Sequence, residues 1–471
     1  MRQKIFLAVV LITFFSILVF ILPIIFEKDL EPNLLISALV MISIFILLSL
    51  ELGHRTSIVL FATLFLMISS IVLELITPRE SLHFIIEAID FNTIGLLLGM
   101  MIIVSILGET GIFNWIGVKA TRWSKGNLWT LMLILCIFTA ITSMFVDNVT
   151  IILLMIPVTI SVFKALNISP IPFIVGQTLS SNIGGGATLI GDPPNILIGT
   201  AANIDFNSFI IHMGPSIFVS FLVGLFLIRI MFMKDLMKNI SGISLKLKTI
   251  NDEDLIKDQS LLKKSILVLL SVVILFVLQG MIGIEVSVIA MGGAAVLLII
   301  TRVHVEKILQ EVDWATLLFF AGLFVIVGIM EESGLITLLA NFVLNTTNGD
   351  PFLTFYLIIW LSAISSGFID NIPFTATMIP IVESINADQN FNQYSSDMQY
   401  SPLWWALAFG ADLGGNATLI GSSAGVVAAG MAIRYGYKIS FFRWFKIGFP
   451  FTIITVFVGS LVLTLSFLLK L

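Results

Sequence analysis

The sequence has few of the features that soluble or disulfide-stabilised folds require. Only 11% of its 471 residues are charged, whereas soluble domains carry about 25%. The single cysteine, Cys136, lies inside an apolar run and excludes a disulfide scaffold or a cysteine-based metal site. The four histidines are scattered and form no HExxH pair, so no structural metal site is expected. There is no ATP-binding motif, so a primary pump would need a separate ATPase subunit. No basic patch indicates nucleic acid.

Apolar residues dominate the sequence instead. They make up 58% of the chain, and the mean hydropathy is +1.09. A membrane span needs about 20 apolar residues, and only helices or closed barrels satisfy their backbone in lipid. The apolar runs are continuous rather than alternating, which excludes a barrel. The sequence therefore predicts an all-α polytopic membrane protein.

The apolar runs predict about eleven transmembrane helices and two re-entrant hairpins. The hairpins are 128–163 and 351–382, because Asp-Asn interrupts each segment and leaves arms of about 16 residues, too short for comfortable spans. The predicted spans are 4–26, 33–50, 56–76, 91–108, 173–202, 208–232, 265–281, 284–301, 313–330, 402–432 and 445–469.

The placement of basic residues predicts the orientation. With a cytoplasmic N-terminus, nearly all Lys and Arg, Arg55 among them, fall on the cytoplasmic side, and only Lys28, Arg79 and Lys470 fall outside. The first run, 4–26, is long for a signal peptide and lacks a cleavage site, so we expect a retained helix. A multi-pass protein of the plasma (inner) membrane is predicted, with the lipid bilayer as its solvent.

The chain contains two copies of one pattern. Asp90-Phe-Asn-Thr93, Gly99 and Asp147-Asn148 recur 223 residues later as Asp313-Trp-Ala-Thr316, Gly322 and Asp370-Asn371. Segment 182–191, NIGGGATLIG, matches 412–421, DLGGNATLIG, at seven of ten positions. The domains expected are an extra N-terminal helix (1–32), a first repeat (33–233), a cytoplasmic linker (234–264) and a second repeat (265–471).

Each repeat holds an odd number of crossings, so the copies are expected to be inverted. Inverted repeats with broken helices are the architecture of secondary transporters. The breaks are predicted at GGGATLIGDPPN (184–195) and GGNATLIGSSAG (414–425), because glycine and Pro-Pro cannot continue a helix there. Freed carbonyls suit a cation, and half-helix N-termini suit anionic groups. The alternative is that these glycines only allow close helix packing.

Four segments resemble the ion transporter superfamily that includes arsenite permeases, NhaD-type sodium/proton antiporters and sodium-coupled dicarboxylate transporters, with the closest likeness to the melanosomal P protein and its bacterial relatives. They are SMFVDNVT (143–150), NIGGGATLIGDPPN (182–195), IDNIPFTATMIP (369–380) and ALAFGADLGGN (406–416). The resemblance implies a homodimer. In the dicarboxylate branch each hairpin tip reads Ser-Asn-Thr and helps to bind sodium, whereas here Asp precedes Asn at both tips.

The two tip carboxylates, Asp147 and Asp370, suggest a cation or proton site, because a charge inside the membrane is costly and is retained for function. The alternative is that each caps the returning helix arm. Asp412 stands where the first repeat has Asn182, so the halves are chemically unequal. Sodium is expected at Asn148 and Asn371 if it is the coupling ion.

We therefore predict an ion-coupled secondary active transporter that moves arsenite or another small inorganic or organic anion by alternating access. Its coupling ion is H+ or Na+, and it needs no cofactor. The alternatives are an NhaD-type sodium/proton antiporter, a passive anion channel and an intramembrane aspartyl protease, which lacks its Gly-x-Gly-Asp motif. The residues predicted to bind substrate or ion are Asp147, Asn148, Thr150, Asn182, Gly184, Gly185, Thr188, Asp192, Asn195, Asp370, Asn371, Thr375, Asp412, Gly414, Gly415, Asn416 and Thr418.

Overall fold

The computed structural model describes residues 31–50, 52–166, 168–237, 255–388, 391 and 401–469, and all regular structure within them is helical. The predicted helix 4–26 and most of the predicted linker lie outside the described residues. In the first repeat the helices are α2 (Pro32–Ser49), α3 (Arg55–Val72), α4 (Ser81–Ala88), α5 (Phe91–Glu109), α6 (Ile112–Trp123), α7 (Leu128–Ser143), α8 (Asn148–Ala165), α9 (Ile171–Gly185), α10 (Pro193–Ala201) and α11 (Phe206–Met231).

After the first repeat come the short helix α12 (Met233–Leu236) and the second repeat. The helices of the second repeat are α14 (Gln259–Ile282), α15 (Val286–Thr301), α16 (Val305–Glu311), α17 (Trp314–Glu332), α18 (Leu335–Thr347), α19 (Pro351–Phe368), α20 (Asn371–Asn386), α21 (Pro402–Gly414), α22 (Ser423–Arg434) and α23 (Phe441–Leu469).

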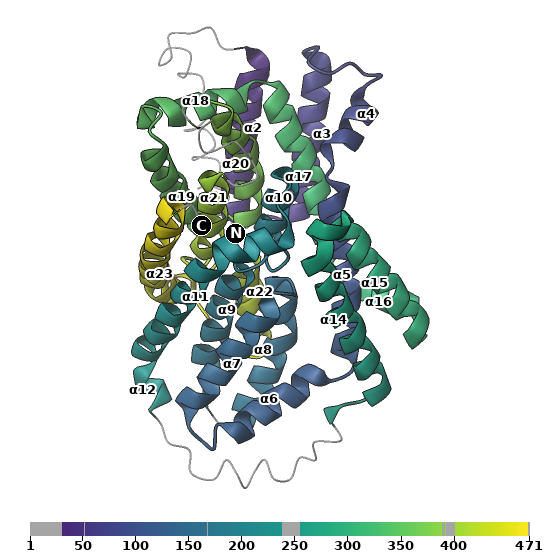
Figure 1. Cartoon of the computed structure of the whole chain (residues 1–471), viewed down its shortest axis with the longest axis vertical. Helices are drawn as coiled ribbons and strands as arrows, with labels where there is room; N and C mark the ends of the chain where they lie inside the picture. The colour runs from purple at the N-terminus through teal and green to yellow at the C-terminus, as the bar shows by residue number, and fades with distance from the viewer. Residues whose placement is uncertain are drawn as a thin grey trace.

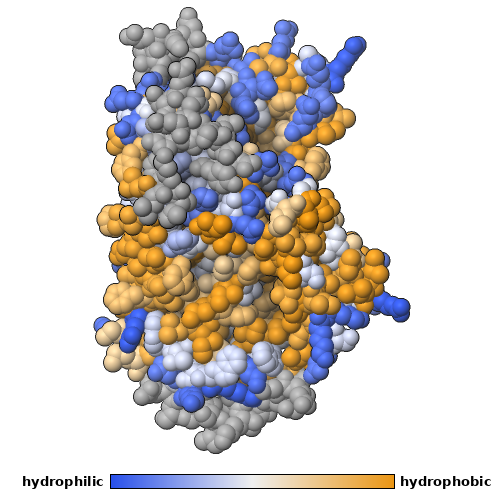
Figure 2. Space-filling view, viewed as in Figure 1, coloured by the Kyte–Doolittle hydropathy of each residue, from blue (hydrophilic) through white to orange (hydrophobic). Residues whose placement is uncertain are grey.

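The helices have the length and composition of membrane spans. Eight of those described are long and apolar enough to cross a bilayer. Figure 2 shows apolar surface across the middle of the molecule and hydrophilic residues gathered toward its two ends. The predicted all-helical polytopic fold is confirmed. The total of eleven spans stays a prediction.

The two repeats produce the same series of helices in opposite orientations. Helix α6 corresponds to α18 in the order of elements, and Figure 1 places α6 at the lower end of the molecule and α18 at the upper end. The short helices α4 and α16 likewise occupy equivalent places before α5 and α17. These four short helices were not expected from the sequence, because each is too short for a span and α6 and α18 have one polar face.

The repeats are interleaved rather than stacked as separate domains. Helix α3 of the first repeat packs against α17 of the second, and α5 packs against α15. The second arm of each hairpin, α8 or α20, contacts the half-helix that follows the break in the other repeat, α22 or α10. The breaks and hairpin tips of both repeats therefore meet in the interior.

The repeated Asp-x-x-Thr sequence begins the long helices α5 and α17. Asp90 accepts hydrogen bonds from the backbone N–H groups of Asn92 and Thr93 at 2.9 and 3.2 Å. Asp313 accepts from the backbone N–H of Thr316 at 3.1 Å and from its hydroxyl at 2.5 Å. A side-chain cap satisfies N–H groups that the first turn of a helix leaves free. The motif thus starts a helix at the same place in each repeat.

Helix α14 begins inside the predicted linker. Its N-cap, Asp258, accepts hydrogen bonds from the backbone N–H groups of Ser260 and Leu261 at 2.8 and 2.9 Å. The first turns of α14 carry Lys263 and Lys264, and these charged residues are the reason that the sequence predicted a linker up to residue 264. Lys264 donates to the backbone oxygen of Ile300 at 2.8 Å and so joins α14 to α15.

Gly99 and Gly322 occupy equivalent positions in the two repeats, but we expect alanine at these positions to lower stability by different amounts. A Cβ on Gly99 would lie 2.6 Å from the backbone carbon of Ala290 in α15, whereas one on Gly322 would meet the side chain of Val59 at 2.9 Å. Backbone cannot move without separating helices, but a side chain can shift. We expect Gly99→Ala to destabilise the protein by about 1–3 kcal/mol, and Gly322→Ala by clearly less. Thermal unfolding of the purified variants in detergent measures this, and equal losses would contradict the close α5–α15 contact.

Candidate functional site

Each hairpin tip carries an Asp that caps the returning arm. Asp147 accepts from the backbone N–H groups of Val149 and Thr150 at 3.1 and 2.9 Å, and also from the Thr150 hydroxyl. Asp370 accepts from the backbone N–H of Ile372 at 3.1 Å. The capping alternative is therefore confirmed for both carboxylates. Their role in ion binding stays a prediction.

Both predicted helix breaks are present. Helix α9 ends at Gly185 and α10 begins at Pro193, while α21 ends at Gly414 and α22 begins at Ser423. The threonine of each break ties it to the hairpin of its own repeat. Thr188 donates to the backbone oxygen of Met144, and Thr418 donates to that of Gly367 at 2.5 Å.

Glycines let the broken helices lie directly on the first hairpin arms. A Cβ on Gly184 would lie 2.3 Å from the backbone oxygen of Ala140 in α7, and one on Gly414 would lie 2.5 Å from that of Ala363 in α19. The packing alternative thus holds for these two positions. Gly185 and Gly415 instead face the far side of their own breaks, where a Cβ would meet the oxygens of Gly191 and Gly421 at 2.7 and 3.1 Å.

The two tip amides converge on one carboxylate. Asp192, which is 1% exposed, accepts from the side-chain amide of Asn148 at 2.6 Å and from that of Asn371 at 3.3 Å. Asp192 is the N-cap residue of α10 but makes no side-chain capping bond there. Its carboxylate is thus used to join the two repeats.

Asn182 extends this polar cluster across the repeats. Its amide nitrogen donates to the side-chain oxygens of Asn416 and Ser422, both at 2.9 Å, and its oxygen accepts from Asn148 at 3.2 Å. All these residues are buried. These hydrogen bonds fix the two breaks relative to each other, because moving them apart would leave buried amides without partners, and a buried polar group without a partner is costly. Thr375, also predicted for the site, has no bond to its hydroxyl in the described part of the chain.

Asp412 differs from the other carboxylates because it lacks a donor. It is fully buried, and neither of its oxygens has a hydrogen-bond partner among the described residues. It lies against the first break, since a Cβ on Gly186 would meet one of its oxygens at 3.0 Å. The side chain beside it is Asn195, whose amide nitrogen donates to the backbone oxygens of Gly185 and Thr188 at 3.2 and 3.1 Å. The amide oxygen of Asn195 is unpaired as well.

The two tip carboxylates line different cavities. Asp147 and Thr150 line a cavity of 590 Å³ together with the exposed Lys257 and Lys307, and Asp370 lines a second cavity of 320 Å³. Lys307 forms an ion pair with Glu109, and its hydrogen bond to that carboxylate raises the pKa of the lysine. The tip carboxylates therefore border cavities, whereas the tip amides face the buried cluster.

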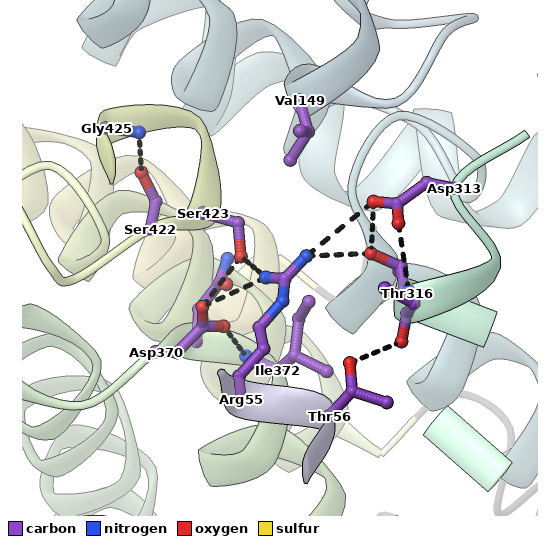
Figure 3. Close-up of polar contacts among 12 residues, drawn as sticks. Arg55, Thr56, Val149, Asp313, Thr316, Asp370, Ile372, Ser422, Ser423 and Gly425 are labelled. Carbon is purple, nitrogen blue, oxygen red and sulfur yellow. Dashed lines mark hydrogen bonds and ion pairs between the residues drawn. The ribbon is translucent and has the colours of Figure 1, made fainter. Parts of the chain in front are cut away.

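Three residues at this site were not predicted from the sequence. Arg55 was grouped with the cytoplasmic basic residues, but its guanidinium lies beside the second hairpin tip, with Ser423 next to it (Figure 3). Ser422 receives the amide of Asn182 and caps α22 through the N–H of Gly425 at 3.1 Å. The sequence signal that could have identified Arg55 is its position as a single basic residue directly before an apolar span. Among the described residues no group of three or more His, Cys, Asp or Glu could hold a metal ion.

Comparison with known proteins agrees with this architecture. The sequence matches the family described as citrate transporters over residues 45–410. An uncharacterized transporter of Mycobacterium bovis is 37% identical over 84% of this chain and 91% of its own length. The P protein of Homo sapiens is 34% identical over 91% of this chain, which spans 59% of that protein. The resemblance expected from the motifs is thus confirmed.

A solved structure shares the fold. The YdaH transporter of Alcanivorax borkumensis, whose crystal structure is described as revealing an unusual topology, aligns with a TM-score of 0.51. The alignment covers 83% of this chain and 89% of that chain at 16% identity. The likeness therefore concerns the fold alone.

The two buried carboxylates predict opposite effects of Asp→Asn changes on stability. Asp192→Asn replaces an acceptor oxygen with a donor that faces Asn148 or Asn371, and we expect a loss of about 1.5–3 kcal/mol. Asp412→Asn removes a buried charge that has no hydrogen-bond partner among the described residues, and we expect an unchanged or higher melting temperature. Thermal unfolding in detergent at neutral pH measures both. Equal destabilisation by the two changes would show that Asp412 also has donors.

Proposed function

The chain belongs to the citrate transporter family and is a membrane transporter, and we propose that it is an ion-coupled secondary active transporter of small anions in the plasma membrane. The observation that carries this proposal is the neighbouring pair Asp412 and Asn195, in which both carboxylate oxygens and the amide oxygen have no hydrogen-bond partner among the described residues. A carboxylate that is buried without donors is costly unless a proton or a metal cation neutralises it. A group that can gain and lose a cation is what coupling requires.

The position of this pair supports alternating access. Asp412 belongs to the break of the second repeat, and Asn195 belongs to the half-helix α10 after the first break. A cation bound between them would hold the two breaks together, and its release would leave them free to separate. The broken helices of inverted repeats are the usual place for such a site.

The family description favours an anion as the substrate. It makes citrate the first anion to test, and arsenite or another inorganic oxyanion the next. The cavity lining carries charges of both signs: its basic residues are Arg55, Lys257 and Lys307, and its acidic residues are Glu109, Asp147, Glu311 and Asp313. The basic side chains supply the donors that a charged oxyanion needs.

Sodium/proton exchange is the second candidate function. The observation that favours it is the buried carboxylate of Asp192, which accepts hydrogen bonds from the tips of both hairpins. Sodium and a proton would compete for this carboxylate. In that case the cation is the cargo and no anion is needed.

Transport by the purified protein in proteoliposomes separates these functions. Uptake of labelled citrate or arsenite is measured with an imposed pH or sodium gradient, and sodium-driven proton movement is measured without the anion. Gradient-driven anion uptake supports the proposal. Proton movement that needs sodium but no anion supports the exchanger, and anion flux that ignores both gradients indicates a passive channel.

Asp412→Asn is predicted to uncouple transport without unfolding the protein. The amide imitates a carboxyl group that permanently carries its proton, so a gradient can no longer load or unload the site. We expect gradient-driven uptake to fall by at least about tenfold, which corresponds to 1.4 kcal/mol, while exchange of labelled for unlabelled anion across the membrane continues. Asp350→Asn, the same change at an exposed carboxylate that caps α19, is the control and should keep coupling. Normal gradient-driven uptake by Asp412→Asn would remove this carboxylate from the mechanism.

A further inference from the structure

Arg55 lies at the junction of the two repeats, where its hydrogen-bond partners are two hydroxyl groups. It is the first residue of α3, and its guanidinium donates one hydrogen bond to the hydroxyl of Ser423 and another, of 2.7 Å, to that of Thr316. Figure 3 shows the guanidinium between these two residues, with α3 on one side and α17 and α22 beyond it. The ring of Phe319 lies 5.6 Å away and supports its face.

Two carboxylates flank Arg55, but neither forms a direct hydrogen bond with it. The nearest carboxylate oxygens belong to Asp370 at 3.7 Å and Asp313 at 3.9 Å, which are ion-pair rather than hydrogen-bond distances. Both carboxylates are already engaged, because each caps its own helix and Asp370 also accepts from Ser423 at 2.7 Å. A guanidinium has five N–H donors in a fork that fits an oxyanion with two parallel bonds. Among the described residues, no carboxylate accepts two parallel hydrogen bonds from the guanidinium of Arg55.

The guanidinium also lies where two cavities meet. Arg55 and Ser423 line both the 590 Å³ cavity and a second cavity of 320 Å³. The Arg55 side chain is 26% exposed, so a small solute can reach it. The contact between these two side chains therefore borders both cavities.

We propose that Arg55, together with the hydroxyls of Ser423 and Thr316, binds the oxyanion of the transported substrate, a carboxylate or a charged inorganic oxyanion. This inference rests on the proposed anion transport. The anion would enter through the 590 Å³ cavity, which Lys257 lines together with Arg55. Neutral species such as arsenous acid would gain little from this site.

The same contact connects the anion to the coupling centre. Asp370, which shares Arg55 and Ser423, directly precedes Asn371, whose amide donates to Asp192. An oxyanion that takes the donors of Arg55 and Ser423 competes with the carboxylate of Asp370 for them. The hairpin tip then loses two of its ties to α3 and α22. Anion binding would in this way affect the buried carboxylates through neighbouring residues of one tip.

Substitution of Arg55 tests this assignment. Arg55→Gln should weaken binding of citrate and sulfate about tenfold or more, because charged hydrogen bonds are lost, and should raise KM for citrate uptake more than it lowers the maximal rate. Arg55→Lys keeps the charge but not the fork and should lie between the wild type and Arg55→Gln. Thr56→Val is the matched control, because Thr56 bonds the backbone oxygen of Ala315 at 2.7 Å and does not line either cavity. It should behave as wild type.

Anion binding is measured on the full-length protein in detergent, as the rise in melting temperature with citrate or sodium sulfate at fixed pH and sodium, with sodium chloride as the ionic-strength reference. Arg55→Gln/Asp370→Asn, which removes one charge of each sign, provides a second variant if Arg55→Gln alone does not fold. Stabilisation of the wild type that both variants lose supports the site. Unchanged stabilisation of the variants, or none of the wild type by either anion, overturns it.

The proposed function can fail separately from this inference. Gradient-driven uptake with a normal KM in the Arg55 variants would overturn the anion site and leave coupled transport intact. Anion binding that depends on Arg55, combined with uptake that ignores every imposed gradient, would support the site and contradict the coupling.

Discussion

The carboxylate of Asp192 receives the amides of Asn148 and Asn371, one from the hairpin tip of each repeat. Asp192 and Asn148 belong to the first repeat, so the second hairpin can reach this carboxylate only because the repeats interleave, as they do through α3 with α17 and α5 with α15. The glycines that let α9 and α21 lie on the first hairpin arms bring the breaks to the same depth. The packing of the interior thus brings the tips of both hairpins to the carboxylate of Asp192.

The repeats are similar in backbone but not in chemistry. The first has Asn182 before its break and Asp192 after it, whereas the second has Asp412 before and Ser422 after. Each repeat therefore contributes one buried carboxylate, from opposite sides of its break. Asp192 accepts from two side-chain amides, whereas neither oxygen of Asp412 has a hydrogen-bond partner among the described residues. We propose that this inequality leaves Asp412 as the position for the coupling cation in a pseudo-symmetric frame.

Local sequence signals predicted the features that depend on local chemistry. Asp-Asn after short apolar arms indicated both hairpin tips, and glycines with Pro193-Pro194 indicated the breaks, because these residues end helices wherever they stand. Arg55 was misjudged because its partners, Thr316 and Ser423, are hundreds of residues away in the chain. The same reason hid Ser422. The short helices α6 and α18 were missed because neither is long enough to look like a span.

The most direct test of the account is the anion accumulation ratio at zero net flux in proteoliposomes, measured as the imposed proton or sodium gradient is varied. For the wild type the account predicts that this ratio follows one of the gradients with a fixed exponent. For the Asp192→Asn/Asp412→Asn double variant it predicts a ratio that no longer responds to either. A double variant whose accumulation still follows the gradient as the wild type does would contradict the central role of the two buried carboxylates.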